Sequence, residues 1–211
     1  SKSEKRGDMN VQILIQVPKE INENIQLIYK NNNKKINKEI IKWSKYPNVE
    51  PNNISEGRFT KKERAKSNKK EKKWGNKMIK SKYTNQWTNK LGEDLVRDVL
   101  ESKGYTVWKP KSKNGYKPDL ETKDFIYEVK TRNWTTTGTA GEKVLGVPYK
   151  YSDIPKLYKK PLKIVCVAYQ EWELTHSNIR IFSDDISKEK KLMIKMWKKM
   201  NIEFVKFTSM I

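Results

Sequence analysis

The residues best suited to chemistry lie in the stretch PDLETKDFIYEVK, which covers positions 118–130. Asp119 follows a proline, and Glu128 and Lys130 stand two residues apart in an otherwise apolar run. Side chains alternate between the two faces of a strand, so Glu128 and Lys130 share one face while Tyr127 and Val129 share the other. We expect the apolar pair to enter the core and the charged pair to face a cleft.

Asp119 and Glu128 would form a site of hard oxygen ligands if they lie on adjacent strands. Proteins hold Mg²⁺ through one or two carboxylates together with substrate phosphate and water. A metal held in this way lowers the pKa of bound water and neutralises charge on a phosphodiester. The Lys130 ammonium would position or help deprotonate the attacking water, or stabilise the added negative charge. Glu93 is a further candidate acid.

The elements that must position these residues follow from hydrophobic periodicity. Residues 84–104 predict an amphipathic helix with Thr84 as its N-cap and Gly104 as its stop. Its apolar face consists of Trp87, Leu91, Leu95, Val96, Val99 and Leu100. Strands are expected at GYTVWKP, PDLET and FIYEVKT, before a helical or irregular crossover at about 141–160. The run KIVCVAYQ, at 163–170, predicts a buried strand.

After that run we expect a strand near 178–182, a helix at SKEKKLMIKMWKKM and a final strand at IEFVKF. A strand, a crossover and a buried strand imply a parallel pair. The whole order predicts an α/β fold, with a mixed central sheet flanked by helices.

The charge of the chain indicates a polyanionic partner. Its 211 residues include 46 Lys+Arg and 25 Asp+Glu, for a formal net charge of +21. Double-stranded DNA is the first candidate partner, and an anionic membrane surface is the second. Heavy use of Lys, Asn and Ile, as in AT-rich genomes, would explain many lysines, but not why acidic residues fail to balance them.

The residue counts exclude several kinds of chemistry. One cysteine, Cys166, and one histidine, His176, cannot form a disulfide or a Cys/His zinc site. We interpret His176 as a surface loop residue, so any metal ligands must be carboxylates. No run approaches the roughly 20 apolar residues of a membrane span, and the apolar run 11–17 is too short for a signal peptide. These features predict a reducing, intracellular location.

The chain divides into a basic, partly helical N-terminal region at 1–82 and a core at 83–211. Residues 61–82 contain eleven basic and two acidic residues. This block is either a solvated charge run or a helix that lies against DNA phosphates, with Lys73 and Lys77 as contacts and Trp74 as an aromatic neighbour.

The motif that starts with Pro118 and Asp119 and ends with Glu128, Val129 and Lys130 resembles that of the PD-(D/E)XK nuclease superfamily. The resemblance covers about residues 84–170 and implies an α-β-β-β-α-β core. It implies Mg²⁺, which Mn²⁺ could replace, held by Asp119, Glu128 and the Val129 main-chain oxygen. Lys130 would lie near the nucleophile, and Glu93 matches a position that often supplies another acidic contact. Hydrolysis of DNA to 5′-phosphate ends is the implied activity.

Within that superfamily the chain looks most like a type II restriction endonuclease, which implies a homodimer without a small-molecule cofactor. The expected DNA-reading residues follow the active strand; the alternative is an ordinary loop whose tyrosines pack on the sheet. Candidate contacts are Arg132, Asn133, Trp134, Thr135, Thr137, Thr139, Glu142, Lys143 and the cluster Tyr149, Lys150 and Tyr151. Gln170 and Glu171 would either line the same cleft or cap a strand end.

Other interpretations stay open at this point. The enzyme could be a structure-specific nuclease, such as a junction resolvase or repair enzyme, or the chain could be a non-catalytic DNA-binding protein. Glu128 and Lys130 could form an exposed salt bridge worth at most about 1 kcal/mol. Asp119 could be a turn residue, and Glu93 could be only a partner of Arg97.

Overall fold

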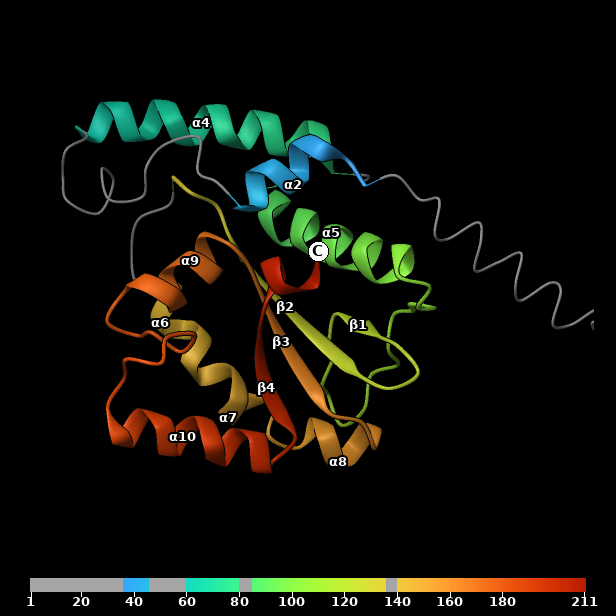
Figure 1. Ribbon diagram of the computed structural model, residues 1–211. Coiled ribbons are helices and arrows are strands. Elements are labelled where there is room, and N and C mark those ends of the chain that lie inside the picture. Colours follow the sequence, from blue (N-terminus) through green and yellow to red (C-terminus); the bar gives the residue numbers. More distant parts are fainter. Residues whose placement is uncertain (1–35, 46–59, 80–84, 136–139) are drawn as a thin grey trace, which may run out of the picture.

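A four-stranded mixed sheet forms the centre of the protein, with helices on both of its faces (Figure 1). The computed structural model describes residues 36–45, 60–79, 85–135 and 140–211. In the order β1-β2-β3-β4, β1 is antiparallel to β2 and the other neighbours are parallel. The predicted mixed α/β sheet with a parallel pair is confirmed. The strands are β1 Leu120–Glu121, β2 Ile126–Arg132, β3 Leu162–Ala168 and β4 Ile202–Lys206.

Helix α5 (Trp87–Ser102) covers one face of the sheet, as its periodicity predicts. Its apolar face is buried against β2. Gly92 permits the close approach, because a Cβ there would lie 1.7 Å from the Thr131 Oγ1 atom. Gly104 has a φ of 87° just beyond the helix end, which confirms the predicted stop. The predicted N-cap, Thr84, lies outside the described residues.

Strands β1 and β2 form the hairpin that the alternating pattern predicts. Leu120 pairs with Tyr127, and Glu121 pairs with Ile126. Tyr127 and Val129 are buried in the α5 core, whereas Ile126 belongs to the core on the opposite face. Side chains therefore alternate as expected, and the even-numbered residues of β2 face away from α5.

The opposite face is covered by the crossover between β2 and β3 and by α10 (Lys188–Lys199). Strand β3 is almost fully buried, as its continuous apolar sequence predicts. Proline occurs in the first turn of both α7 and α8, where its missing N–H costs nothing. The crossover comprises α6 Ala140–Lys143, the 3-10 helix η1 Val144–Gly146, α7 Val147–Lys150 and α8 Ile154–Tyr158.

Two strand predictions are wrong. Residues 178–182 form turns, because α9 (Tyr169–His176) follows β3 and the chain then folds back, with the Phe182 N–H donating to Leu174 O. The segment GYTVWKP pairs with β1 only through an isolated bridge between Trp108 and Glu121. His176 ends α9 rather than lying in a loop, and its ring stacks on that of Trp172.

Two helices of the N-terminal region pack onto the core. Helices α2 (Lys38–Lys45) and α4 (Lys61–Met78) contact α5 through Trp43, Trp74 and Trp87. These helices therefore share one hydrophobic core with the rest of the chain. The apolar run 11–17 lies outside the described residues. None of the described helices has both the length and the apolar character that crossing a membrane requires.

A buried carboxylate, Glu71, fastens α4 to the chain just after β2. Its Oε1 atom accepts from Trp43 Nε1 and from the Trp134 main-chain N–H, both at 2.9 Å. Its Oε2 atom accepts from Asn133 Nδ2 at 3.2 Å, and from the Thr135 N–H at 3.0 Å and hydroxyl at 2.5 Å. Five donors thus compensate for removing this carboxylate from water.

Replacing Glu71 with glutamine should lower the free energy of unfolding by about 2–4 kcal/mol, because the amide turns an NH₂ group toward donors that then lack an acceptor. Chemical denaturation measures this change. The exposed Glu142 provides the control, and Glu142→Gln should stay within about 0.5 kcal/mol of wild type. Equal stability of the two variants would show that the Glu71 network contributes little.

Candidate active site

Asp119 lies where β1 and β2 separate. Its main-chain N–H donates to Tyr127 O at 3.1 Å, and its Oδ2 atom accepts from the Val129 N–H at 2.8 Å. Strand β1 has only two residues and does not reach Val129. The Asp119 side chain therefore accepts the hydrogen bond of the Val129 N–H in place of a main-chain carbonyl of β1. Pro118 precedes Asp119 and has no N–H for the ladder. Asp119 is therefore held against the strand that carries Glu128.

Glu128 is buried, with only 3% of its surface exposed. Lys130 Nζ lies 2.5 Å from its Oε1 atom, and the Lys130 side chain is 32% exposed. The Glu128 Oε2 atom is buried and makes no hydrogen bond of standard geometry, although the Tyr151 hydroxyl lies close enough to interact with the carboxylate. The alternative of a surface salt bridge is thus wrong, whereas the cleft expected beside the pair stays a prediction. The pair consists of a buried acid and a lysine that reaches solvent.

The environment of Glu128 disfavours its charged form. Burial raises the pKa of the Glu128 carboxyl, the charge of Asp119 raises it further, and Lys130 opposes both effects. The Tyr151 hydroxyl faces the same carboxylate: burial raises its pKa, and the charge of Glu128 adds to the increase. Tyr151 itself is buried in the core on this side of the sheet.

Glu93 joins this acidic group from α5. Burial raises the pKa of the Glu93 carboxyl and the charge of Asp119 adds to the rise, so these two carboxylates lie within electrostatic reach of each other. Lys109 Nζ lies 3.8 Å from Glu93 Oε2, and the Glu93 side chain is 22% exposed. Arg97 donates to Val107 O at 3.1 Å. The structure thus gives Glu93 neighbours besides the Arg97 partner considered from the sequence.

The residues present fit a divalent cation held partly by the protein. Among the described residues, no three or more His, Cys, Asp and Glu side chains form a ready-made metal cage. Asp119 and Glu128 offer two carboxylates, which is the number that Mg²⁺ commonly uses alongside water and phosphate. The buried Oε2 of Glu128 makes no hydrogen bond of standard geometry and is therefore available as a ligand atom, with the Tyr151 hydroxyl as a polar neighbour of the carboxylate. The main-chain oxygen of Val129 is the third candidate ligand.

Four predicted DNA-reading residues instead hold the interior together. Arg132 is 6% exposed, and its Nη1 atom lies 2.6 Å from Glu173 Oε1. Asn133, Trp134 and Thr135 are buried and bind Glu71. We correct the expectation for these four residues, because buried side chains with interior partners present no donors to a DNA groove.

The other predicted contacts divide into two groups. Lys143, Tyr149 and Lys150 are exposed on the crossover, and Lys73 and Lys77 are exposed on α4. Thr137 and Thr139 lie outside the described residues. Gln170 and Glu171 are buried in the first turn of α9, where Glu171 accepts from the Thr208 N–H and hydroxyl. This contact fixes the segment that follows β4. Glu171 therefore resembles the strand-end cap considered from the sequence, although the strand end that it holds is that of β4.

Sequence reasoning missed two residues that shape the site region. In the sequence, Glu71 is one of two acidic residues in a basic run. An acid among so many lysines could have indicated a side chain that turns inward to bind other parts of the chain. Tyr151 was assigned to a DNA-reading cluster, whereas its hydroxyl faces Glu128. No local pattern could reveal that contact, because it depends on how the crossover returns over β2.

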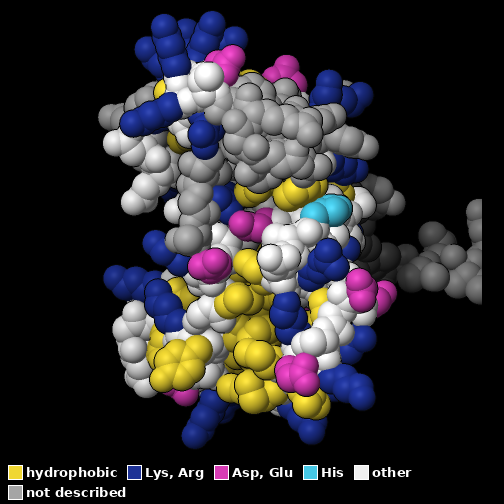
Figure 2. All heavy atoms as spheres, turned by 90° about the vertical axis from the view of Figure 1, so that its left-hand side faces the viewer, with side chains coloured by type: hydrophobic (Ala, Val, Ile, Leu, Met, Phe, Trp, Pro, Cys, Tyr) yellow, Lys and Arg dark blue, Asp and Glu magenta, His cyan; other side chains and the backbone are white. Residues whose placement is uncertain are grey.

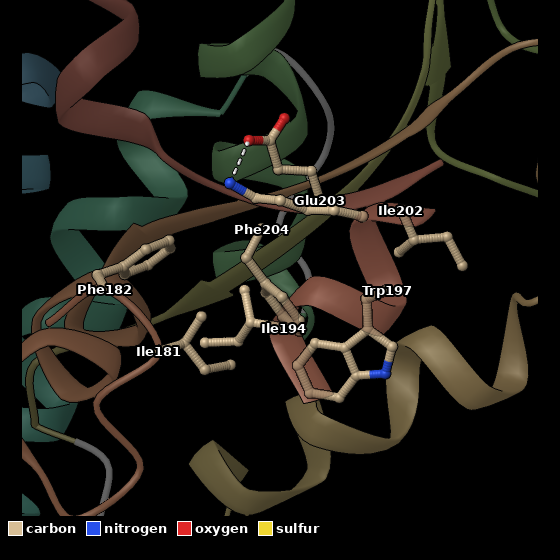
Figure 3. Close-up of a pocket in the computed structure, with 8 residues that line it drawn as sticks. Ile181, Phe182, Ile194, Trp197, Ile202, Glu203 and Phe204 are labelled. Carbon is tan, nitrogen blue, oxygen red and sulfur yellow. Dashed lines mark ion pairs between the residues drawn. The ribbon is translucent and has the colours of Figure 1, made fainter. Parts of the chain in front are cut away.

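Glu203 on β4 offers a natural comparison for Glu128 (Figure 3). It forms ion pairs with Lys163 and, at 3.7 Å, with Lys198, and its side chain is 40% exposed. The hydrogen bond from Lys163 lowers the pKa of the Glu203 carboxyl. Two Glu–Lys pairs of one sheet therefore have opposite pKa shifts, because only Glu128 is deeply buried and faces a second carboxylate.

This contrast predicts opposite effects of glutamine on stability. The native state binds the Glu128 proton more tightly than the unfolded state, so ionisation costs stability as pH rises through the raised pKa. Without metal at pH 8, Glu128→Gln should therefore raise the melting temperature, whereas Glu203→Gln should lower it. Thermal unfolding in EDTA measures both changes. A lower melting temperature for Glu128→Gln would identify the Glu128–Lys130 pair as a stabilising ion pair.

Comparison with protein-family models, curated proteins and solved structures found no match to this chain. The chemistry of Glu93, Asp119, Glu128 and Lys130 is therefore interpreted from their geometry and environment.

Proposed function

We propose that the protein is a Mg²⁺-dependent endonuclease that hydrolyses phosphodiester bonds of double-stranded DNA. The observation that carries this proposal is the buried Glu128 carboxylate, which has one oxygen without a hydrogen bond of standard geometry and lies beside Asp119. A protein gains no stability from such an arrangement unless a cation or proton fills it. Lys130 adds a positive charge at the solvent side of the same carboxylate.

The order of elements supports the resemblance to PD-(D/E)XK nucleases. Helix α5 precedes β1 and β2, Asp119 stands directly before β1, Glu128 lies on β2, and the helical crossover leads to β3. The chain departs from the α-β-β-β-α-β pattern at its first strand, which is only the bridge at Trp108. The departure lies at the edge of the sheet and leaves the two strands beside the acidic residues intact.

The type II restriction activity is the narrower part of the proposal. It requires side chains that read base edges in a groove. The exposed crossover residues Lys143, Tyr149 and Lys150 are the described candidates for this role. A junction resolvase or repair nuclease would use the same catalytic residues on branched or damaged DNA.

In the proposed mechanism, the residues hold the cation, orient the attacking water or stabilise charge on the phosphate. A bound Mg²⁺ would lower the pKa of its water and neutralise charge on the phosphate. Asp119 and Glu128 would hold it, with the Val129 carbonyl as a further ligand. The Lys130 ammonium would orient the attacking water and stabilise negative charge on the phosphate oxygens. Glu93 would contribute a further acidic contact beside Asp119, and the Tyr151 hydroxyl would orient Glu128.

Lys130→Met should lower the rate of DNA cleavage by about 10²–10³-fold, because it removes a charge beside the reacting phosphate. Asp119→Asn and Glu128→Gln should lower it at least as much. Plasmid DNA with Mg²⁺ or Mn²⁺ provides the assay, with product ends tested for 5′-phosphates. All three variants should bind DNA in EDTA within about threefold of wild type.

Lys163→Met is the matched control, because Lys163 on β3 pairs with Glu203 on β4, away from the acidic group. It should cut at the wild-type rate. Discrete plasmid fragments would support restriction activity, and cleavage of branched or damaged DNA alone would favour the structure-specific nuclease. Binding without cleavage by any divalent metal would show a non-catalytic DNA-binding protein.

A homodimer follows from the proposed function, because one catalytic cluster per chain cuts one strand and a palindromic site matches two-fold symmetry. Apolar side chains gather on one face of the protein (Figure 2). They surround a hollow of about 360 Å³ between the crossover and α10. Glu142 and Lys190 both line this hollow, so a two-fold related copy would bring opposite charges together. Of the exposed apolar residues, Leu145 and Met193 line this hollow, and Leu192 and Met196 neighbour Met193 on α10.

The double variant Met193→Asp, Met196→Asp should shift the protein from dimer to monomer, because two carboxylates would become buried at the interface. Light scattering coupled to size-exclusion chromatography measures the mass. Tyr105→Asp is the control, because Tyr105 is exposed away from this face, against a separate hollow beside α5. A monomeric wild type at tens of micromolar would contradict the proposed interface.

A further inference from the structure

Helix α4 carries a row of lysines on the side that points away from the core. Lys62, Lys66, Lys69, Lys73 and Lys77 recur every three or four residues, so they lie along one face of the helix. All five are exposed, and none forms an ion pair with another described residue. Glu71 and Gly75, the buried residues of α4, lie two positions from Lys69, Lys73 and Lys77, about 200° around the axis.

This lysine row differs from an ordinary solvated charge run because its helix is firmly docked. Gly75 lies so close to α5 that a Cβ there would be 2.0 Å from the Trp87 ring. Glu71 binds main-chain N–H groups of Trp134 and Thr135, directly after the strand that carries Glu128. The buried face thus holds α4 on both α5 and the end of β2, while the opposite face keeps unneutralised charge.

The spacing of the row suits a phosphate backbone. An 18-residue helix is about 27 Å long. B-DNA carries one phosphate charge per about 1.7 Å of its axis, so this length spans a stretch of duplex with about sixteen phosphates, and five lysines can neutralise several of those that face the helix. Five long, flexible ammonium groups can follow these phosphates without a fixed register. Their unpaired charge costs stability through mutual repulsion, and an aligned polyanion removes that cost.

We propose that the lysine row of α4 is a contact surface for the phosphate backbone of duplex DNA, anchored by Glu71 to the catalytic strand. The identity of this polyanion rests on the proposed function. The row supplies affinity without reading sequence, because contacts to phosphates position a protein but carry no base information.

The test replaces all five lysines with glutamine and measures binding to a 30-base-pair duplex in EDTA from 50 to 300 mM KCl. Each lost phosphate contact should flatten the slope of log K against log[salt] by about 0.9. We expect the slope to change by about 3–4.5, and affinity at 100 mM salt to fall on the order of 100-fold. Unchanged thermal unfolding would confirm that the fold is intact.

The matched control removes five exposed lysines from α8 and α10, which lie at the opposite end of the molecule from α4 (Figure 1). It replaces Lys156, Lys188, Lys191, Lys195 and Lys199 with glutamine. Both variants have the same net charge, so the control should change the slope by less than about 1. An equal effect of the two variants, or an unchanged slope for the α4 variant, would overturn the proposal.

Two further outcomes have separate meanings. Tighter binding of duplex RNA than of the same duplex in DNA would overturn the assignment to DNA. Wild-type protein that binds through α4 but cuts no substrate would leave this surface standing and refute the nuclease.

Discussion

The structure depends on how it accommodates a buried negative charge at Glu128. Removing a carboxylate from water is costly unless charges or hydrogen bonds replace the lost hydration. At Glu128 the compensation is partial: Lys130 neutralises one oxygen, the other makes no hydrogen bond of standard geometry, and Asp119 adds repulsion. The two carboxylates stay together because β1 separates from β2 at Asp119. There the Asp119 side chain, instead of a main-chain carbonyl, accepts the hydrogen bond from the Val129 N–H, which holds it beside Glu128.

Glu71 shows what a purely structural buried carboxylate looks like in the same chain. It is also almost fully buried, but five donors satisfy both of its oxygens. The two glutamates differ in the completeness of their partners rather than in burial. This contrast is the physical basis for assigning Glu71 to stability and Glu128 to chemistry, since protein sites that bind ions leave ligand atoms unsatisfied by the protein itself.

The sequence predicted the helices and strands whose pattern of apolar residues reflects which of their faces is buried. The face of α5, the alternation along β2 and the apolar run of β3 each follow from one element facing one core. The strand predicted at 178–182 failed because its apolar residues pack back over α9 instead of pairing with the sheet. Residues 132–135 were polar and aromatic enough to suggest DNA contacts. The partner of Asn133, Trp134 and Thr135 is Glu71, which lies more than sixty residues away, and the partner of Arg132 is Glu173, so a local pattern cannot contain these contacts.

The charge distribution gives the proposed cation a second role. The excess of 21 positive charges attracts a polyanion to the protein as a whole. The charge of Asp119 raises the pKa of both Glu93 and Glu128, whereas Lys109 and Lys130 oppose this rise. A divalent cation bound there would add positive charge where a scissile phosphate approaches the carboxylates. In the proposed function, the lysines of α4 would attract the DNA at a distance from these carboxylates, and the cation beside Glu128 would neutralise charge on the scissile phosphate.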